Sequence, residues 1–183
     1  MATVKSRRRL SSLALGVGVL VAVLLTACDF QVFRSAFAEV TYSIPTVTDE
    51  QVQLDESGRF ADEEARVNSA FITGTAGDLD GDGILDGIAV LATNTGGSGT
   101  FYTVHAILGD GDGGYTDVDS VFLGDRIAVP SVTASGANIE VSILDRAADE
   151  AFTVEPHVPG VVRLTFRDGE LFRQRPLQET PTE

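Results

Sequence analysis

The sequence predicts an all-β fold made of antiparallel strands. From Val67 onward, short runs with alternating apolar and polar residues follow one another, and glycine or aspartate separates them. These runs are rich in β-branched residues, and no long segment carries a convincing helical period. Residues 39–174 are therefore expected to form one β-rich domain, as a meander sheet or a sandwich, with at most one short helix.

The first 27 residues have the pattern of an export signal. Lys5 and Arg7–Arg9 precede a run of 13 apolar or glycine residues from Leu13 to Leu25. A membrane-spanning helix needs about 20 apolar residues, so this run is too short to span and fits a secretory signal. We expect residues 1–27 to be removed on export.

The end of this signal, Leu25-Thr26-Ala27-Cys28, resembles a bacterial lipobox, in which small residues precede a cysteine. The resemblance implies cleavage before Cys28 and attachment of diacylglycerol to its thiol. Residues 28–38 would then be a lipidated tether that holds the domain on a bacterial cell membrane, facing the periplasm or the exterior. The alternative is an ordinary signal peptide with an incidental cysteine. Cys28 is the only cysteine, so no internal disulfide is possible.

The chain after the signal is strongly acidic. Four of the 13 Lys and Arg residues precede Cys28, which leaves nine bases against 27 acids and a formal charge of about −18. Such a surface repels phosphate groups, so neither nucleic acid nor an anionic membrane surface is an expected partner. The lipid is the only membrane anchor that we expect.

Eight strands are expected after residue 66. They are Ala70–Thr75, Gly87–Thr93, Phe101–Leu108, Tyr115–Phe122, Arg126–Thr133, Asn138–Leu144, Val161–Arg167 and Glu170–Arg173. The pattern from Thr41 to Glu64 is mixed, because Thr48-Asp49-Glu50-Gln51 has the spacing of a helix capping box while Val52 and Leu54 alternate as in a strand. A strand is favoured there. Pro130 has no amide N–H, so its strand should lie at a sheet edge.

Glycine and aspartate at the connections predict hairpins. Asp110–Gly114 and Ser135–Ala137 suit turns that need positive φ, and Asp168-Gly169 is a strong signal for a two-residue hairpin. Pro176 and Pro181 stand among polar residues and predict a flexible tail over residues 175–183.

Residues 78–86 have the composition of a calcium-binding loop. Aspartates stand at positions 1, 3, 5 and 9, which are Asp78, Asp80, Asp82 and Asp86. Ca²⁺ takes about 6–8 oxygen ligands, and closely spaced aspartates supply them with little backbone. Gly83 permits a sharp turn, and the carbonyl of Ile84 is the natural peptide ligand. The alternative is a set of turn residues on an acidic surface, and Mg²⁺ fits less well because it demands tighter octahedral geometry.

The same region resembles a known repeat. Gly77–Leu91, followed by Phe101–Asp110 and Gly111–Tyr115, is similar to one FG-GAP or VCBS repeat of the integrin-type β-propeller. The resemblance implies an aspartate-rich loop between two strands that holds Ca²⁺, with ligands matching Asp78, Asp80, Asp82, Ile84 and Asp86. Residues from Val67 to Leu171 are also similar to a group of small bacterial lipoproteins of about this length with no established activity.

The chain departs from a propeller in one respect. A propeller needs about 4–8 blades, and the chain carries one copy of the loop. Either the hairpins pack into a sheet or sandwich within a monomer, which is favoured, or several molecules assemble.

The twelfth position from Asp78 is Ala89 rather than the glutamate of an EF-hand, so a helix–loop–helix calcium switch is disfavoured.

The remaining polar residues carry weaker signals. Asp110, Asp112, Asp117 and Asp119 lie close in sequence, but Gly114 stands where a third ligand is needed, so a solvated hairpin face is favoured over a second metal site. His105 and His157 lack metal-ligand spacing and are expected to be strand-face or loop residues. The sequence contains no nucleophile elbow and no phosphate-cradling loop.

These features predict a lipid-anchored protein of the bacterial cell envelope. Its calcium-stabilised β domain is expected to be non-catalytic and to act as a binding or accessory module. The alternative is a calcium-dependent envelope hydrolase that acts on glycan or another anionic substrate. An enzyme should show polar side chains that converge with an open metal position in a concave pocket.

Overall fold

The computed structural model describes Phe37 and residues 39–174. The predicted signal over residues 1–27, the lipid attachment at Cys28, most of the tether and the tail over residues 175–183 lie outside the described residues. The described part is all-β, and its strands pair antiparallel, as predicted.

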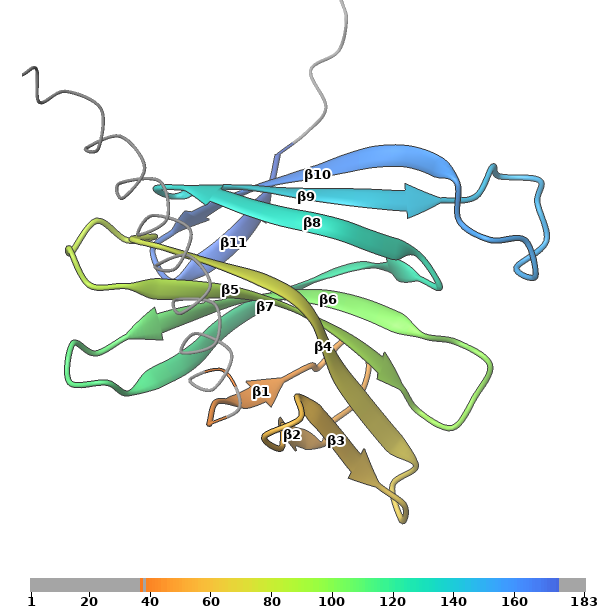
Figure 1. Cartoon of the computed structure of the whole chain (residues 1–183), viewed down its shortest axis with the longest axis horizontal. Coiled ribbons are helices and arrows are strands. Elements are labelled where there is room, and N and C mark those ends of the chain that lie inside the picture. Colours follow the sequence, from red (N-terminus) through yellow and green to blue (C-terminus); the bar gives the residue numbers. More distant parts are fainter. Residues whose placement is uncertain (1–36, 38, 175–183) are drawn as a thin grey trace, which may run out of the picture. The chain divides into compact units, whose positions relative to one another are not determined.

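Eleven strands of the described region form three sheets (Figure 1). The five-stranded sheet has the order β3-β4-β5-β6-β7, with bounds Arg59–Asp62, Val67–Gly77, Asp86–Asn94, Phe101–Gly109 and Tyr115–Asp125. The four-stranded sheet has the order β11-β10-β9-β8, with bounds Glu170–Arg173, Val158–Arg167, Asn138–Asp145 and Ala128–Ser135. A two-stranded ribbon joins β1 (Thr41–Ser43) to β2 (Gln51–Gln53). All eight strands predicted after residue 66 are confirmed.

The predicted turn chemistry is confirmed where φ is positive. Asp168 and Gly169 have φ of 54° and 84° in the two-residue connection between β10 and β11. Gly136 has φ of 53° between β8 and β9, where Ser135 pairs with Asn138. Glycine favours this left-handed region because it has no Cβ. The turn residues therefore fix the hairpin registers.

The two larger sheets pack as a sandwich, because alternate residues of each sheet face a shared core. The core comprises one buried set of apolar side chains from both sheets, including Ile88, Val90, Val104, Leu123, Val132, Ile139, Val141, Leu164, Phe166 and Leu171. The neighbouring side chains of each strand lie on the other face of its sheet. Of the predicted alternatives, a meander sheet or a sandwich, the sandwich is the observed fold.

Phe37 and residues 39–54 form a second layer on the opposite face of the five-stranded sheet. Their buried apolar side chains are Phe37, Val40, Tyr42, Ile44, Val52 and Leu54. They cover the face that carries Ala89, Leu91 and His105, so β5 and β6 are buried on both sides. The strand favoured between Thr41 and Glu64 is confirmed, and Thr48 Oγ1 accepts a hydrogen bond from the Glu50 N–H in a turn instead of starting a helix.

The two larger sheets also contact each other along two sides. On one side β4, the neighbour of the edge strand β3, lies against β8, the edge strand that carries Pro130, as its missing N–H predicts. On the other side β7 lies against β11, where the Leu171 N–H donates to Asp119 and the Arg173 guanidinium donates to the Phe122 carbonyl. These contacts cover the edge strands β7, β8 and β11, while the remaining edge strand of the two sheets, β3, is only four residues long, and both features disfavour pairing with another chain.

Candidate metal centre

The aspartate-rich loop connects β4 to β5 at one end of the sandwich. It starts after Gly77 and ends at Asp86, the first residue of β5. Gly81 and Gly83 have φ of 86° and 83°, so both bends in the loop use the left-handed conformation that glycine tolerates best. The turn predicted at Gly83 is therefore present, and Gly81 supplies a second one.

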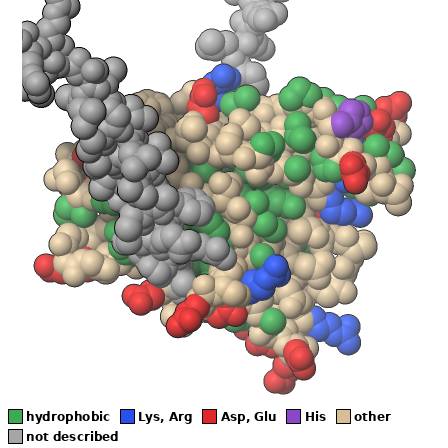
Figure 2. All heavy atoms as spheres, in the orientation of Figure 1, with side chains coloured by type: hydrophobic (Ala, Val, Ile, Leu, Met, Phe, Trp, Pro, Cys, Tyr) green, Lys and Arg blue, Asp and Glu red, His purple; other side chains and the backbone are tan. Residues whose placement is uncertain are grey.

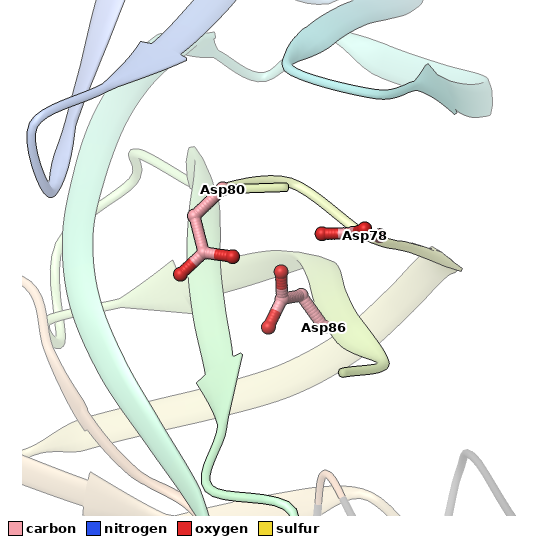
Figure 3. A group of neighbouring side chains, drawn as sticks. All are labelled: Asp78, Asp80 and Asp86. Atoms are coloured by element: carbon pink, nitrogen blue, oxygen red, sulfur yellow. The ribbon is translucent and has the colours of Figure 1, made fainter. Parts of the chain in front are cut away.

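The fold brings three carboxylates of this loop together. Asp78, Asp80 and Asp86 each offer an oxygen atom, and these atoms lie within 4.8 Å of one another. Figure 3 shows the three side chains pointing toward a common space, with Asp78 and Asp86 at the two ends of the loop. A divalent cation at their centre would contact all three, so the described loop can hold a metal ion.

Asp86 is the fixed member of this group. It is 1% exposed, and its two oxygens accept hydrogen bonds from the backbone N–H of Leu79 at 2.7 Å and of Gly109 at 3.1 Å. Gly109 belongs to the end of β6, and a Cβ atom there would lie 2.5 Å from the Leu85 carbonyl oxygen. Glycine at 109 thus allows the β4–β5 connection and the β6–β7 connection to approach each other, and the Asp86 carboxylate is hydrogen-bonded to both.

The other carboxylates are oriented by the loop backbone. Asp78 accepts from the N–H of Gly81 at 2.7 Å and of Gly83 at 3.1 Å, and Asp80 accepts from the Asp82 N–H at 3.1 Å. These contacts curl the loop around its own side chains and leave acceptor lone pairs for a ligand, because each carboxylate oxygen has two. The site is held in shape before any ligand binds.

Two of the five predicted ligands lie outside the group of three. Asp82 turns its Oδ1 to the N–H of Ile84 at 2.7 Å. Ile84 is half-buried, and its side chain lies over Gly111 of the next hairpin. Asp82 and the Ile84 carbonyl therefore stay predictions as ligands, while Asp78, Asp80 and Asp86 are placed together.

The chemistry of the donor set selects the kind of ion. The grouped donors are all carboxylate oxygens, with no imidazole nitrogen or thiolate among them. Hard cations such as Ca²⁺ and Mg²⁺ prefer such donors, whereas Zn²⁺ and Cu²⁺ prefer nitrogen and sulfur. Like charges at 4 Å repel by about 1 kcal/mol in water and by several times more near protein, and a bound cation removes this repulsion.

The second group of aspartates serves separate contacts. Asp110 accepts from the N–H groups of Asp112 and Gly114, and these hydrogen bonds lower the pKa of its carboxyl below the ordinary range. Asp119 accepts from Leu171, and Asp117 points to the opposite face of the sheet. The solvated hairpin face that we favoured describes Asp110 and Asp112, but it is wrong for Asp117.

A buried polar centre lies on the second face of the sheet, away from the loop. The His105 side chain is 0% exposed, and its Nδ1 lies 3.1 Å from Asp117 Oδ1, whose side chain is 3% exposed. Its Nε2 lies 2.9 Å from the Thr103 hydroxyl, and the Tyr42 ring packs edge-on at 5.1 Å between centroids. His105 is a strand-face residue, as expected, but its partner was not predicted.

Asp117 also ties the second layer to the sheet. Its Oδ2 accepts a hydrogen bond from the Ser43 N–H at 2.9 Å, and the Ser120 hydroxyl donates to the Ser43 carbonyl at 3.2 Å. These two hydrogen bonds join the backbone of β1 to side chains of β7. Two residues 12 positions apart on neighbouring strands gave no sequence signal, because an irregular register skips Val118 and places Asp117 opposite Ile107, on the same face of the sheet as His105.

Tyr42 makes stability sensitive to high pH. Burial, together with the nearby Asp117 carboxylate, raises the pKa of Tyr42 far above its ordinary value of about 10. Above about pH 10 the unfolded chain loses this proton while the folded chain keeps it, so the free energy of unfolding falls by up to about 1.4 kcal/mol per pH unit. Below that pH the contribution is fully present.

Tyr42→Phe is expected to flatten this alkaline decline. The variant loses the hydrogen bond from Tyr42 Oη to the Phe37 carbonyl, which lowers stability by about 1 kcal/mol at neutral pH. Denaturant unfolding between pH 8 and pH 11 measures both effects, and no lysine after Lys5 adds a titration of its own. Parallel pH profiles for the two proteins would contradict the assignment.

Comparisons with protein-family models, with curated proteins and with solved structures found no match. Within the described residues, no helix has the length and hydropathy needed to cross a bilayer.

Proposed function

We propose that this chain is a lipid-anchored protein of the bacterial cell envelope with a calcium-stabilised, non-catalytic β domain. The observation that carries the proposal is the convergence of Asp78, Asp80 and Asp86 around one space. In this proposal the domain is a monomeric binding or accessory module. The contacts of β4 with β8 and of β7 with β11 support the monomer, because they cover three of the four edge strands of the two larger sheets, and the fourth, β3, is only four residues long.

Calcium is the proposed occupant. Among the described residues three carboxylates are grouped, and the predicted ligands Asp82 and the Ile84 carbonyl would add to them toward a shell of about 6–8 oxygens. Ca²⁺ accepts such irregular, flexible shells, whereas Mg²⁺ demands near-ideal octahedral geometry. Metal analysis after dialysis against excess calcium should find about one calcium per chain. The absence of calcium from the dialysed protein would contradict the proposal.

A structural role for the ion is favoured over a catalytic one. A groove of about 230 Å³ lies beside the loop and is lined by Ile84, Leu85, Gly109, Gly111, Gly113, Gly114 and Tyr115. These residues offer no histidine, serine or carboxylate that faces the groove as a nucleophile or general base. Hydrolysis of glycan or peptidoglycan substrates by the purified protein would instead support the envelope hydrolase.

The likeness to an FG-GAP or VCBS repeat enters the same proposal. The loop joins β4 to β5, and the β5–β6 and β6–β7 hairpins follow, which is the order that the likeness implies.

Figure 2 shows charged side chains mainly at the rim of the face it draws, without a broad basic patch. A broad basic patch is the usual footprint of a nucleic-acid-binding surface, and the proposal includes no nucleic acid.

The lipid anchor has its own test. Cys28→Ser removes the thiol that the lipobox would acylate, so the precursor is expected to stay unprocessed and to take up no lipid. Metabolic labelling with a fatty acid, followed by fractionation of the envelope, measures both. Thr26→Ser leaves the thiol in place and serves as the control, and lipid on the Cys28→Ser protein would rule out the anchor.

A further inference from the structure

Six Asp-Gly dipeptides occur in the described part of the chain. They are Asp80-Gly81, Asp82-Gly83, Asp86-Gly87, Asp110-Gly111, Asp112-Gly113 and Asp168-Gly169. In such a pair the glycine has no side chain to shield its amide nitrogen, so this nitrogen can reach the carboxyl carbon of the preceding aspartate. The dipeptide is then open to spontaneous isomerisation, and the fold decides which of the six reacts.

The reaction needs only water. The glycine nitrogen bonds to the aspartate Cγ, and the carboxyl oxygen leaves as water with one proton from the protonated carboxyl and one from the amide. A five-membered imide results. Water then opens this ring at either carbonyl, which gives back aspartate or gives isoaspartate, whose main chain runs through the side-chain carbonyl. The mass of the product equals that of the starting chain.

Asp78 blocks this reaction at two of the six dipeptides. Its Oδ1 and Oδ2 accept the N–H groups of Gly81 and Gly83, which are the two nitrogens that would attack Asp80 and Asp82. A nitrogen held in a hydrogen bond must first be released before it can rotate toward the preceding side chain. The carboxylates of the loop are thus protected by their own neighbour.

Three further dipeptides are restrained in other ways. Asp86 is buried, and both of its oxygens accept backbone hydrogen bonds. Asp110 accepts two backbone N–H groups, and its lowered pKa keeps it ionised, while ring closure needs the protonated carboxyl. The Gly113 N–H, which would attack Asp112, also faces the Asp110 carboxylate but makes no full hydrogen bond to it, so this is the weakest of the restraints.

Asp168-Gly169 has none of these restraints. The Asp168 side chain is 89% exposed, and its one ion pair is an exposed contact with Arg167 Nε at 3.5 Å. Among the described residues, no group accepts a hydrogen bond from the Gly169 N–H. We propose that Asp168 is the site at which the folded chain isomerises, and that Asp78 protects Asp80 and Asp82 from the same change.

Isomerisation at Asp168 would weaken the end of the sandwich. The dipeptide is the whole connection between β10 and β11, where Arg167 pairs with Glu170. Isoaspartate adds a methylene group to the main chain and disturbs this register, which is fixed by the turn. Leu171 lies in the core one residue beyond the pair and donates its N–H to Asp119. The product should therefore lose the packing of β11.

The test is an ageing experiment on the purified chain in the presence of a chelator, so its result does not depend on a bound metal. Peptide mapping with a fragmentation that separates aspartate from isoaspartate follows all six dipeptides, and the denatured chain gives their unrestrained rates. We expect isoaspartate at Asp168 first in the folded chain. Earlier accumulation at Asp80, Asp82 or Asp112 would overturn the proposal.

Two variants sharpen the test. Asp78→Ala frees the N–H groups of Gly81 and Gly83 and should raise the rates at Asp80 and Asp82 by about 2- to 12-fold, the factor that one net hydrogen bond supplies. Asp112→Ala is the matched control and should leave these two rates unchanged. If Asp78→Ala fails to fold, the order of the sites in the unchanged chain still decides, and equal rates at all six dipeptides would refute the proposal.

Discussion

Asp117→Ala is expected to lower the free energy of unfolding by about 1.5–4.5 kcal/mol. The substitution leaves the buried His105 ring without its acceptor, which costs about 1–3 kcal/mol, and it removes the exposed hydrogen bond from the Ser43 N–H, which contributes about 0.5–1.5 kcal/mol. Domains are stable by only about 5–15 kcal/mol, so this is a large share. The melting temperature should fall by about 4–20 °C.

Asp112→Ala is the matched control for this variant. Asp112 lies on the same hairpin, but it is exposed and contacts only its own turn. A double-mutant cycle with His105→Leu then measures the coupling, and the two losses should not add because both variants break the same contact. An Asp117→Ala protein as stable as Asp112→Ala would show that the second layer is held by apolar contacts alone.

Calcium is expected to stabilise the domain through the loop 78–86. A ligand that binds only the folded form at about ten times its Kd adds roughly 1.4 kcal/mol. For a domain of this size, that free energy raises the melting temperature by about 3–6 °C. Thermal unfolding of residues 28–183, followed by circular dichroism with a chelator and with millimolar calcium, measures the shift.

Asp80→Asn is expected to be at least as stable as the unchanged protein in chelator but less stable than it in calcium. In chelator the variant relieves repulsion among Asp78, Asp80 and Asp86, so it should melt at or above the temperature of the unchanged protein. In calcium it lacks a charged ligand, so it should melt lower. Asp112→Asn removes a carboxylate from the neighbouring hairpin and should keep the full shift. Equal calcium shifts in Asp80→Asn and Asp112→Asn would exclude this loop as the site.

The strands and hairpins of the fold were predictable from local pattern. The alternation after Val67 and the turn residues at Gly136 and Asp168-Gly169 act over a few residues, so they can be read from the sequence. The edge position of Pro130 follows from its missing N–H in the same way. The aspartate spacing predicted Asp78, Asp80 and Asp86 as neighbours because one short loop carries all three.

The remaining features depend on contacts distant in sequence. Phe37 and residues 39–54 pack onto the second face of the sheet and bury β5 and β6 on both sides. The short apolar runs of these strands do not show whether one face or both faces are buried. The His105–Asp117 contact requires an irregular register near Val118, and alternation alone places the two residues differently. The hydrogen bond from the Gly109 N–H to Asp86 likewise forms only where the β4–β5 and β6–β7 connections approach each other in the fold.

Calorimetric titration of residues 28–183 with calcium tests the central claim most directly. We expect about one site per chain with a Kd near 10⁻⁴–10⁻³ M, the range of extracellular modules, and weaker binding of magnesium. Binding should be lost in Asp80→Asn and kept in Asp112→Asn. The absence of binding to either ion at millimolar concentration, or undiminished binding in Asp80→Asn, would contradict a metal held by this loop.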